Sequence, residues 1–383
     1  MRLHVSSKRS PESLSESFGG MPLENQRLMS LDVIRGLDMF WIIGGEAIVK
    51  GLAKVFPGKV AETCVLQLEH VPWEGLHFYD VIWPLFMFIV GVAMRLSLNK
   101  RRSMGVGNQT LYVHAFKRAA ILFFLGMAAQ GNLLAFDLSM LHPCYSVLHG
   151  IAAGYLIATI VMVSLRPLWQ AIVSAGFLIS YWALLMLIPV PGFGRGILTP
   201  EGNAAAYIDR LVLGRFHYGL NTWFLSYLGF ASSVLLGALA GELLLCRRSA
   251  WKKITGLFLA GTGLLLLGLI WSLWFPIIKL MWTSSYVLVT AGISFLLMGL
   301  FYTIVDVLQW RKWAFGFAVI GMNSLAVYMA TMLFNFRHIG NIFVGSLLTR
   351  VGNWDGFLEA SAGFTVVWLI LYWMYRTKSF VRL

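Results

Sequence analysis

Charged residues are scarce in this sequence. Of its 383 residues only 12% are charged, whereas 58% are hydrophobic, and soluble domains carry roughly 25% charged residues. A soluble enzyme could not bury so much apolar surface, so composition favours a polytopic membrane protein surrounded by a lipid bilayer. The predicted fold class is therefore all-α.

Acidic residues are scarcer than basic ones. The chain has 30 Lys and Arg against 17 Asp and Glu, which gives a formal net charge of +13. In a soluble protein this balance would favour nucleic acid as a partner. Here the basic residues cluster in short loops between apolar segments, as the cytoplasmic loops of membrane proteins do. We therefore predict no nucleic-acid partner.

Cysteine is also rare, with Cys64, Cys144 and Cys246 alone. No pair has the Cys-x-x-Cys spacing or the Cys/His spacing of a zinc or iron–sulfur site, so we predict no metal. Cys64 and Cys144 fall near the same predicted face of the membrane, and their spacing leaves open whether they form a disulfide.

The start of the chain has no apolar stretch of the secretory kind. Residues 1–28 are polar, Ser-rich and unpatterned, and we expect a disordered cytoplasmic tail without a cleaved signal. Residues 29–383 are expected to form a single transmembrane domain.

About ten apolar segments are long enough to cross a hydrocarbon core of about 30 Å, which takes roughly 20 helical residues. The segments are approximately Ser30–Val55, Asp80–Leu98, Ala115–Leu134, His142–Leu165, Leu168–Val190, Thr222–Cys246, Trp251–Leu273, Leu280–Val307, Trp313–Phe336 and Phe357–Arg376. Ile339–Leu348 is too short to span and fits an interfacial or re-entrant piece.

The positions of Lys and Arg predict the orientation. The basic clusters within 100–118, 247–253, 311–312 and 376–382 all lie on one side if the N-terminus is inside. Both termini are then cytoplasmic. On the opposite face lie His70 and the longest loop between spans, Pro191–Asn221.

The stretch His70–Asp80 carries the densest chemistry of the chain, with two histidines, two carboxylates and several aromatic residues directly before a span. Histidine exchanges protons readily near neutral pH, so His70 is the candidate catalytic base. A carboxylate from Glu46 or Asp80 could orient its ring.

Two alternatives weigh against this interpretation. The stretch also fits an ordinary interfacial loop in which Trp73, Phe78 and Tyr79 are membrane-interface aromatics. Asp80 alone fits a helix cap.

Polar residues of the spans gather in the outer half, on the side of His70. At 1.5 Å per residue, Glu46 lies about 21 Å beyond Asp32 along the first span. Because polar groups in a bilayer are costly, each is a functional candidate. The candidate acceptor-binding residues are Trp73, His149, Ser284, Tyr286, Asn323 and Ser324.

Structural roles are open for the same residues. His149 fits a hydrogen-bonded packing histidine, and Asn323 and Ser324 fit residues that join neighbouring helices. Asp32 and Arg35, three residues apart, fit a structural ion pair.

Five ordered motifs resemble the family of heparan-α-glucosaminide N-acetyltransferase and its bacterial relatives. They are Leu31–Leu37, His70–Leu76 with Asp80 and Pro84 through Gly91, Ala206–Gly214 with His217, Trp282–Tyr286, and Gly321–Tyr328. The resemblance covers nearly the whole chain from about residue 28.

The resemblance implies an acyltransferase domain over 29–383. Members of this family move the acetyl group of cytosolic acetyl-CoA, their co-substrate, to an amino sugar on the far side of the membrane. The active histidine lies in the motif that His70 matches, so His70 would act as base or acetyl carrier. The bacterial relatives imply a multi-pass protein of the bacterial inner membrane.

Two departures from the family pattern fall in the expected site. Glu46 stands where the family's human member has an Asn, and His149-Gly150 stand where members commonly carry Gln-Arg. The acceptor, and N- against O-transfer, therefore stay open.

A cytosolic nucleotide donor would need cations at the inner mouth of the bundle. The candidates for binding CoA phosphates are Arg35, Arg95, Lys100, Arg101, Lys117 and Arg118. The alternative role of these residues is to anchor the topology.

Other functions remain alternatives at this level. A proton-coupled amino-sugar transporter would use Glu46 and His149 as proton relays, although no inverted repeat or paired broken helices are evident. An O-acetyltransferase of a surface polysaccharide would share the chemistry and differ in its acceptor. The sequence also leaves the oligomeric state open, a homodimer included.

Overall fold

The computed structural model describes residues 28–381, so the expected N-terminal tail lies outside the described residues except for Leu28. The described residues form helices and two isolated β-bridges, with no strand. The α-helices are α2 (Met29–Phe40), α3 (Glu46–Val55), α4 (Lys59–Gln67), α5 (Ile82–Ser103), α6 (Asn108–Ala129), α7 (Val147–Ser164), α8 (Pro167–Leu187), α9 (Ala204–Leu213), α10 (Tyr227–Leu245), α11 (Ala250–Trp271), α12 (Ser284–Phe301), α13 (Phe315–Met322), α14 (Ser324–Leu333), α15 (Phe336–Leu348) and α16 (Asp355–Arg376).

Short helical turns link some of these helices. The π-helical segments are η2 (Trp41–Gly45) and η7 (Tyr302–Val307), and the 3₁₀ turns are η3 (Phe78–Val81), η4 (Leu133–Ala135), η5 (Leu138–Met140), η6 (Gly214–Phe216) and η8 (Gly352–Trp354).

Eight helices of the described chain are long and apolar enough to cross a membrane, and the bent pair α13–α14 makes a ninth if it is one span. The protein is thus a multi-pass helical membrane protein. The remaining one of the ten expected spans, Ser30–Val55, is formed by α2, η2 and α3. Its charged residues, among them Asp32, Asp38 and Glu46, make this segment less apolar than the eight helices that are apolar enough to cross a membrane.

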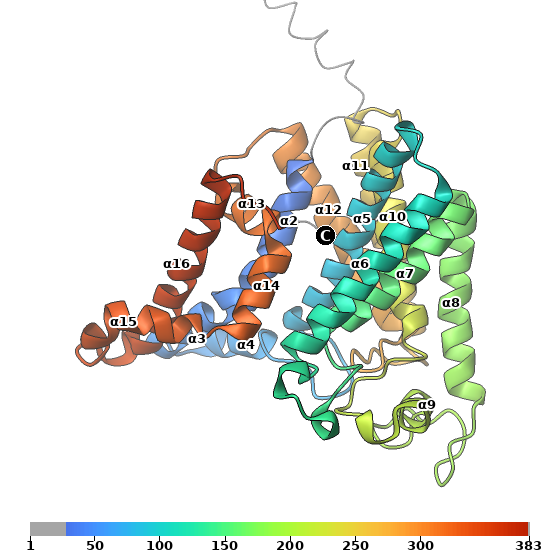
Figure 1. The fold of residues 1–383 in the computed structure, drawn as a ribbon, viewed down its shortest axis with the longest axis horizontal. Coiled ribbons are helices and arrows are strands. Elements are labelled where there is room, and N and C mark those ends of the chain that lie inside the picture. The colour runs from blue at the N-terminus through green and yellow to red at the C-terminus, as the bar shows by residue number, and fades with distance from the viewer. Residues whose placement is uncertain (1–27, 382–383) are drawn as a thin grey trace, which may run out of the picture.

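The centre of the bundle is built from α5, α10 and α12, whose apolar residues are mostly buried. Two glycines let α5 and α10 touch backbone to backbone. A Cβ on Gly91 would lie 1.9 Å from the Val234 carbonyl oxygen, and one on Gly237 would lie 2.0 Å from that of Phe88. Figure 1 shows α16, α15 and α3 gathered on one side of the molecule and α6, α7 and α8 on the other.

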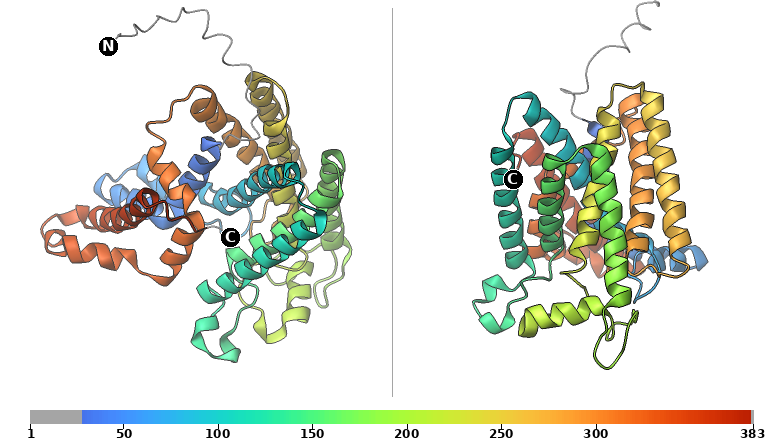
Figure 2. Two further views of the ribbon diagram at one scale, coloured as in Figure 1. Left: turned by 45° about the horizontal axis from the view of Figure 1, so that its top comes forward. Right: turned by 90° about the vertical axis from the view of Figure 1, so that its right-hand side faces the viewer.

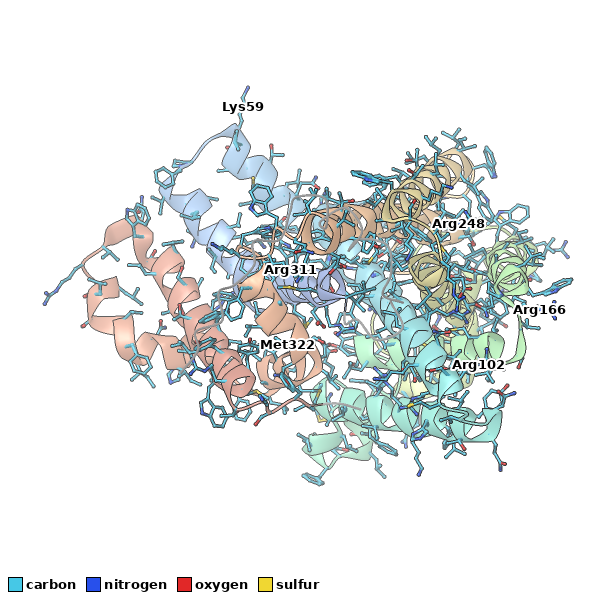
Figure 3. All side chains as sticks on the ribbon, turned by 90° about the horizontal axis from the view of Figure 1, so that it is seen from above. Lys59, Arg102, Arg166, Arg248, Arg311 and Met322 are labelled. Carbon is cyan, nitrogen blue, oxygen red and sulfur yellow. The ribbon has the colours of Figure 1, made fainter. Side chains whose placement is uncertain are left out.

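The two ends of the bundle differ in charge. The connections that carry Arg102, Arg166, Arg248 and Arg311 lie at one end, which Figure 3 views from above. We call this the basic end. The opposite end holds α4, α9 and α15, and the right-hand view of Figure 2 shows α9 lying across it. The basic loops thus share one end, as their sequence positions predict, while their orientation relative to the cytoplasm stays a prediction.

The helix pair α13–α14 bends by 74° at Asn323. The Asn323 amide donates to the Ser379 carbonyl oxygen (3.3 Å) and accepts from the Val381 amide (3.1 Å). The C-terminal segment therefore occupies both hydrogen-bonding groups of this buried side chain. The short segment expected to be interfacial or re-entrant forms α15, which runs across the end of α16 (Figure 1).

Candidate active site

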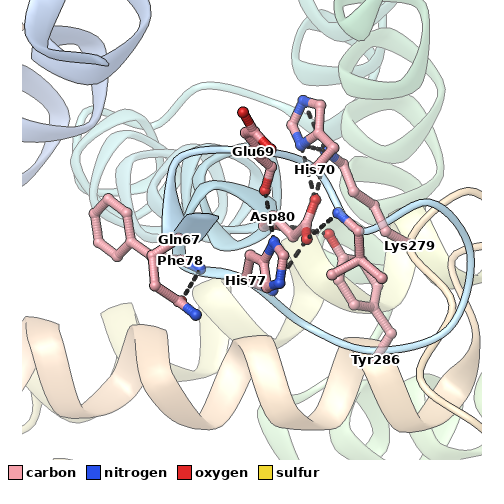
Figure 4. Close-up of polar contacts among 9 residues, drawn as sticks. Gln67, Glu69, His70, His77, Phe78, Asp80, Lys279 and Tyr286 are labelled. Carbon is pink, nitrogen blue, oxygen red and sulfur yellow. Dashed lines mark hydrogen bonds and ion pairs between the residues drawn. The ribbon is translucent and has the colours of Figure 1, made fainter. Parts of the chain in front are cut away.

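The connection between α4 and α5 is fixed by hydrogen bonds at both ends, and we call it the His70 loop (residues 68–81). The Gln67 side chain accepts from the Phe78 amide (2.9 Å), and His77 Nδ1 donates to the Glu69 carbonyl oxygen (2.9 Å). The Gly75 amide donates to the Ile277 carbonyl oxygen (2.9 Å), which ties the loop to the segment before α12. These contacts tie the loop to α4 and to the segment before α12 (Figure 4), at the end opposite the basic end (Figure 1).

The buried carboxylate of Asp80 organises this loop. Its side chain is 1% exposed, and Oδ1 lies 2.8 Å from His70 Nδ1 and 3.1 Å from Lys279 Nζ. Oδ2 accepts from the amides of Val71 (3.3 Å) and His77 (3.1 Å). A buried carboxylate is tolerated only when it is paired and hydrogen-bonded, and four donors meet that need here.

Asp80 is held from the helix side as well. The Tyr286 hydroxyl, fully buried in α12, donates to the Asp80 carbonyl oxygen (2.7 Å). The turn η3 therefore cannot move without breaking a contact to the centre of the bundle.

His70 lies at the surface of the site. Its side chain is 54% exposed, its Nδ1 faces Asp80, and its ring centroid lies 5.0 Å from that of Tyr79. A carboxylate on one imidazole nitrogen orients the ring and stabilises the imidazolium when the ring takes a proton. The pair thus has the arrangement of a base with its orienting acid.

Lys279, from the segment between α11 and α12, is a site residue that the sequence interpretation missed. Its Nζ lies 2.8 Å from His70 Nδ1 and 3.1 Å from Asp80 Oδ1 (Figure 4). Burial lowers the pKa of Lys279, and the Asp80 charge opposes that shift. A signal was present in the sequence, since Lys279 is the only charged residue between Lys253 and Asp306.

Glu46 is not the carboxylate that contacts His70. It pairs with Lys50 (2.8 Å) and lies beside the Tyr79 hydroxyl. Gly44, close to Glu46 in the chain, packs against Phe364 of α16. Of the two partners considered for His70, the structure brings Asp80 to the ring.

Trp73 is the acceptor candidate that lies in the His70 loop itself. Its indole N–H donates to the Leu198 carbonyl oxygen (2.8 Å), and its ring is half-buried. The ring is therefore fixed in orientation, and part of it is open to solvent.

His149 has no free ring nitrogen. Its Nδ1 accepts from the amides of Tyr145 (3.2 Å) and Ser146 (3.1 Å) at the start of α7, and its Nε2 donates to the Phe123 carbonyl oxygen (3.2 Å). This arrangement is that of the hydrogen-bonded packing histidine considered from the sequence.

The remaining acceptor candidates lie apart from His70 or are already bonded. Ser284 donates to the Leu178 carbonyl oxygen (2.7 Å), and Tyr286 is bonded to Asp80 as above. Asn323 binds the C-terminal segment, and Ser324 is the next residue, at the start of α14. These groups hold helices and loops together in the described structure.

The six cation candidates fall into three kinds. Arg35 pairs with Asp32 (3.6 Å), as expected for a structural ion pair, and Arg95 pairs with Glu242 of α10. Lys100 and Lys117 are exposed. Arg101 and Arg118 line a cavity of about 150 Å³ at the basic end.

This cavity lies between α5, α6 and α7, and we call it the basic-end cavity. Its polar lining comprises Ser97, Arg101, His114, Arg118, Tyr155 and Thr159. The Arg118 guanidinium lies 4.8 Å from the centre of the Tyr155 ring, and its buried Nε has no hydrogen-bond partner. The arrangement offers donors to an anion.

Within residues 28–381 no group of three or more His, Cys, Asp or Glu side chains could hold a metal ion. The three cysteines are unpaired, with Cys64 exposed and Cys144 buried, which answers the question left open by their spacing.

No protein-family model matches the chain. Among curated proteins it is similar to heparan-α-glucosaminide N-acetyltransferase of Mus musculus and of Homo sapiens, with 26% identity to each. Each match covers 82% of this chain and 56% of the relative.

The chain is distantly related to both proteins. It spans little more than half of their length. The relationship agrees with the resemblance seen in the motifs and supports an acyltransferase relative rather than a specific assignment.

Proposed function

We propose that this chain is a membrane acetyltransferase that moves the acetyl group of cytosolic acetyl-CoA to an amino-sugar acceptor at the opposite face. The observation that carries the proposal is the contact of His70 Nδ1 with the buried Asp80 carboxylate at 2.8 Å. The distant relationship to an N-acetyltransferase supports the same chemistry.

The chemistry assigned to His70 is proton transfer. The acceptor amine attacks the thioester carbonyl carbon, the C–S bond breaks and releases CoA as its thiolate, and the imidazole takes the proton that the nitrogen loses. Asp80 stabilises the resulting imidazolium from the Nδ1 side. Direct acetylation of His70 before transfer would use the same residues, with the acetyl group carried on the ring.

The half-open ring of Trp73 is the acceptor-side group that we assign to sugar binding. Its indole N–H is already bonded to Leu198, so the part of the side chain that is not buried offers apolar surface and no free donor. A flat aromatic face suits the apolar face of a sugar ring, whereas specificity for the amine would come from groups nearer His70.

We assign donor binding to the basic-end cavity. Arg101 and Arg118 supply positive charge there, and guanidinium groups bind phosphate well. Arg101 follows Asp80 by 21 residues along η3 and α5, which corresponds to about 30 Å of helix. A donor whose phosphates are held at the basic end would have to extend its acetyl group over about this length of α5 to reach His70.

The transporter alternative receives less support from the geometry. It required His149 as a proton relay, and both nitrogens of that ring are engaged in hydrogen bonds. Transporter folds place paired broken helices in two repeats, and the described chain has one strongly bent pair, α13–α14.

The test is acetyl transfer by the purified full chain from labelled acetyl-CoA. The acceptor panel contains glucosamine, galactosamine and glucose, the last offering hydroxyl groups alone. Labelled N-acetyl sugar, formed only with acetyl-CoA present, is the expected result, and a base-labile product from glucose would assign O-transfer instead. Uptake of amino sugar into sealed vesicles without acetyl-CoA, and with no acetylated product, would contradict the proposal.

A further inference from the structure

An apolar groove lies between α2, α13 and α16 and shares no residue with the candidate active site or the basic-end cavity. Its volume is about 420 Å³. Trp313 and Phe317 of α13, Phe364 and Trp368 of α16, and Phe40 of α2 contribute aromatic rings to its lining. We call it the α13–α16 groove.

The aromatic rings of the groove pack against one another. The Phe40 ring lies edge-on to that of Phe317, with centroids 5.8 Å apart, and edge-on to that of Phe364, at 5.3 Å. The Trp313 ring lies 6.3 Å from that of Phe317. Aromatic pairs in this geometry are favourable beyond the area they bury, so we expect the rings to hold the groove open rather than collapse into it.

Gly316 leaves space in the wall of the groove. A Cβ on this residue would meet only the indole nitrogen of Trp368, at 3.7 Å, which is an ordinary contact distance. The backbone of α13 therefore has room for a larger side chain at this position, and that side chain would occupy the groove.

The groove opens to the surroundings of the helix bundle. Of its lining residues, Trp313 is 44% exposed, and Thr365 is exposed as well. Apolar cavities do not hold water, and proteins contain few voids of this size. In a bilayer the surroundings are lipid chains. A hydrocarbon chain in the groove would touch three helices at once and gain dispersion contacts with each.

A stripe of side chains on α16 connects the groove to the basic end. The Trp368 ring stacks on that of Tyr372 with centroids 5.3 Å apart, and the Arg376 guanidinium donates to the Tyr372 hydroxyl (3.2 Å). Along the helix, Arg376 lies about 12 Å from Trp368 and about 18 Å from Phe364. One leaflet of the hydrocarbon core is about 15 Å deep. A lipid with its headgroup at Arg376 would therefore place its acyl chain in the groove.

Two cations lie where this headgroup would be. Arg376 and Lys312 are both exposed, and neither forms a salt bridge with an acidic side chain among residues 28–381. Phe315, three residues after Lys312, packs against Tyr375, with ring centroids 5.5 Å apart. This contact brings the start of α13 to the last turn of α16. Basic positions between membrane helices are typical binding sites for anionic lipid headgroups.

We propose that the α13–α16 groove binds an anionic phospholipid, with an acyl chain in the groove and the headgroup phosphate on Arg376 and Lys312. The proposal does not rest on the proposed function, because it uses other residues. It differs from the ordinary coating of a membrane protein by lipid, since it requires both a negative headgroup and an open groove.

The experiment is photo-crosslinking of the purified full chain in phosphatidylcholine vesicles at low salt. A trace of phosphatidylglycerol or of phosphatidylcholine, each with the same diazirine-bearing acyl chain, is the probe, and mass spectrometry identifies the labelled peptides. Gly316→Phe fills the groove. Its matched control is Gly176→Phe on α8, an exposed position where a Cβ would meet nothing within 4 Å. A third variant combines Lys312→Gln and Arg376→Gln.

The expected result is strong labelling of the α13 and α16 peptides by the anionic lipid. In the parent, phosphatidylglycerol should label them roughly 25-fold more than phosphatidylcholine, because each Lys or Arg near a membrane surface contributes about fivefold. Gly316→Phe should remove this labelling and Gly176→Phe should keep it. Loss of the two cations should make the two lipids label equally. All variants should keep the elution profile of the parent.

Three outcomes would overturn the proposal. Equal labelling of the parent by the two lipids would show ordinary lipid coating. Labelling that persists in Gly316→Phe at the level of Gly176→Phe would show that the lipid lies outside the groove. Absence of lipid label on these peptides in the parent would mean that another protein surface, such as a second copy of the chain, covers the groove.

Discussion

Asp80 is a single residue with two roles, one at the start of a helical turn and one beside His70. The sequence allowed Asp80 to be either a helix cap or a partner of the base. In the structure its carboxylate accepts a hydrogen bond from the His77 amide at the start of η3 and also contacts His70. A buried carboxylate with four donors is costly to disturb, because removal of one member leaves the others unpaired.

Asp209 gives a prediction on stability that is independent of the candidate site. Burial raises the pKa of this carboxyl group to about 6, while the amides of Trp223 and Phe224 act in the opposite direction. The native state therefore holds its proton between about pH 4, near the value for an unfolded chain, and about pH 6. Stability from this group is present below pH 4 and is lost as pH rises toward 6.

The measurement compares thermal unfolding of the parent and of Asp209→Asn in detergent from pH 4 to 7.5. The free energy of unfolding of the parent, relative to the variant, should fall by on the order of 2–3 kcal/mol over this range and level off above pH 6. A difference that does not change with pH would show that Asp209 is ionised throughout in the native state.

The chemistry of His70 and Asp80 could be proposed from the sequence because both lie in one short stretch. Lys279 could not be placed beside them, since it is 199 residues away from Asp80 in the chain. His149 shows the reverse difficulty, because its sequence position suggested a site and its contacts show a helix cap. Only the fold tells which polar groups are already bonded.

At the scale of elements, hydropathy predicts straight spans well and interrupted ones poorly. The apolar runs of the sequence predict the spans that form α5 to α8 and α10 to α12. They do not predict the π-helical segment η2 or the bend at Asn323, because these depend on packing against α16 and on the C-terminal segment. Irregular backbone inside a membrane protein is tolerated where other protein groups satisfy it.

The basic-end cavity supplies a prediction on donor binding. Changing Arg101 and Arg118 together to Gln should weaken acetyl-CoA binding by tenfold or more, because hydrogen bonds to charged groups contribute about 1.5–3 kcal/mol each. The matched control changes Lys100 and Lys117 to Gln, which removes the same charge from neighbouring positions outside the cavity.

Binding of acetyl-CoA to the two purified variants at low salt is the measurement. Equal weakening in both would mean that net charge, rather than the basic-end cavity, attracts the donor. No weakening in either would show that these residues only anchor the topology.

At the scale of the whole molecule, the proposal requires donor and acceptor to reach opposite ends. The basic loops and the His70 loop do lie at opposite ends of the bundle (Figure 1). The excess of Lys and Arg in the basic loops predicts that the basic end faces the cytoplasm. The chain matches little more than half of its curated relatives, so their complete activity is not carried over with the relationship.

Exposed Cys64 on α4 tests this orientation without an engineered probe. With Cys144 and Cys246 changed to Ser, Cys64 should react with an impermeant maleimide in intact cells. A cysteine-free background carrying Ser249→Cys, at the basic end, is the matched control and should react only after lysis. The reversed pattern would place His70 in the cytoplasm and contradict the proposed direction of transfer.

The central claim is that His70 performs the proton transfer, and the kcat of His70→Ala tests it most directly. The matched control is His77→Ala, a histidine of the same loop whose ring bonds only a main-chain carbonyl. Both variants should keep the elution profile of the parent in detergent. General-base catalysis contributes about 10²- to 10⁴-fold, so His70→Ala should lose at least about a hundredfold in kcat, while His77→Ala should lose far less. A His70→Ala protein that turns over acetyl-CoA within about fivefold of the parent, below that general-base range, would contradict the account.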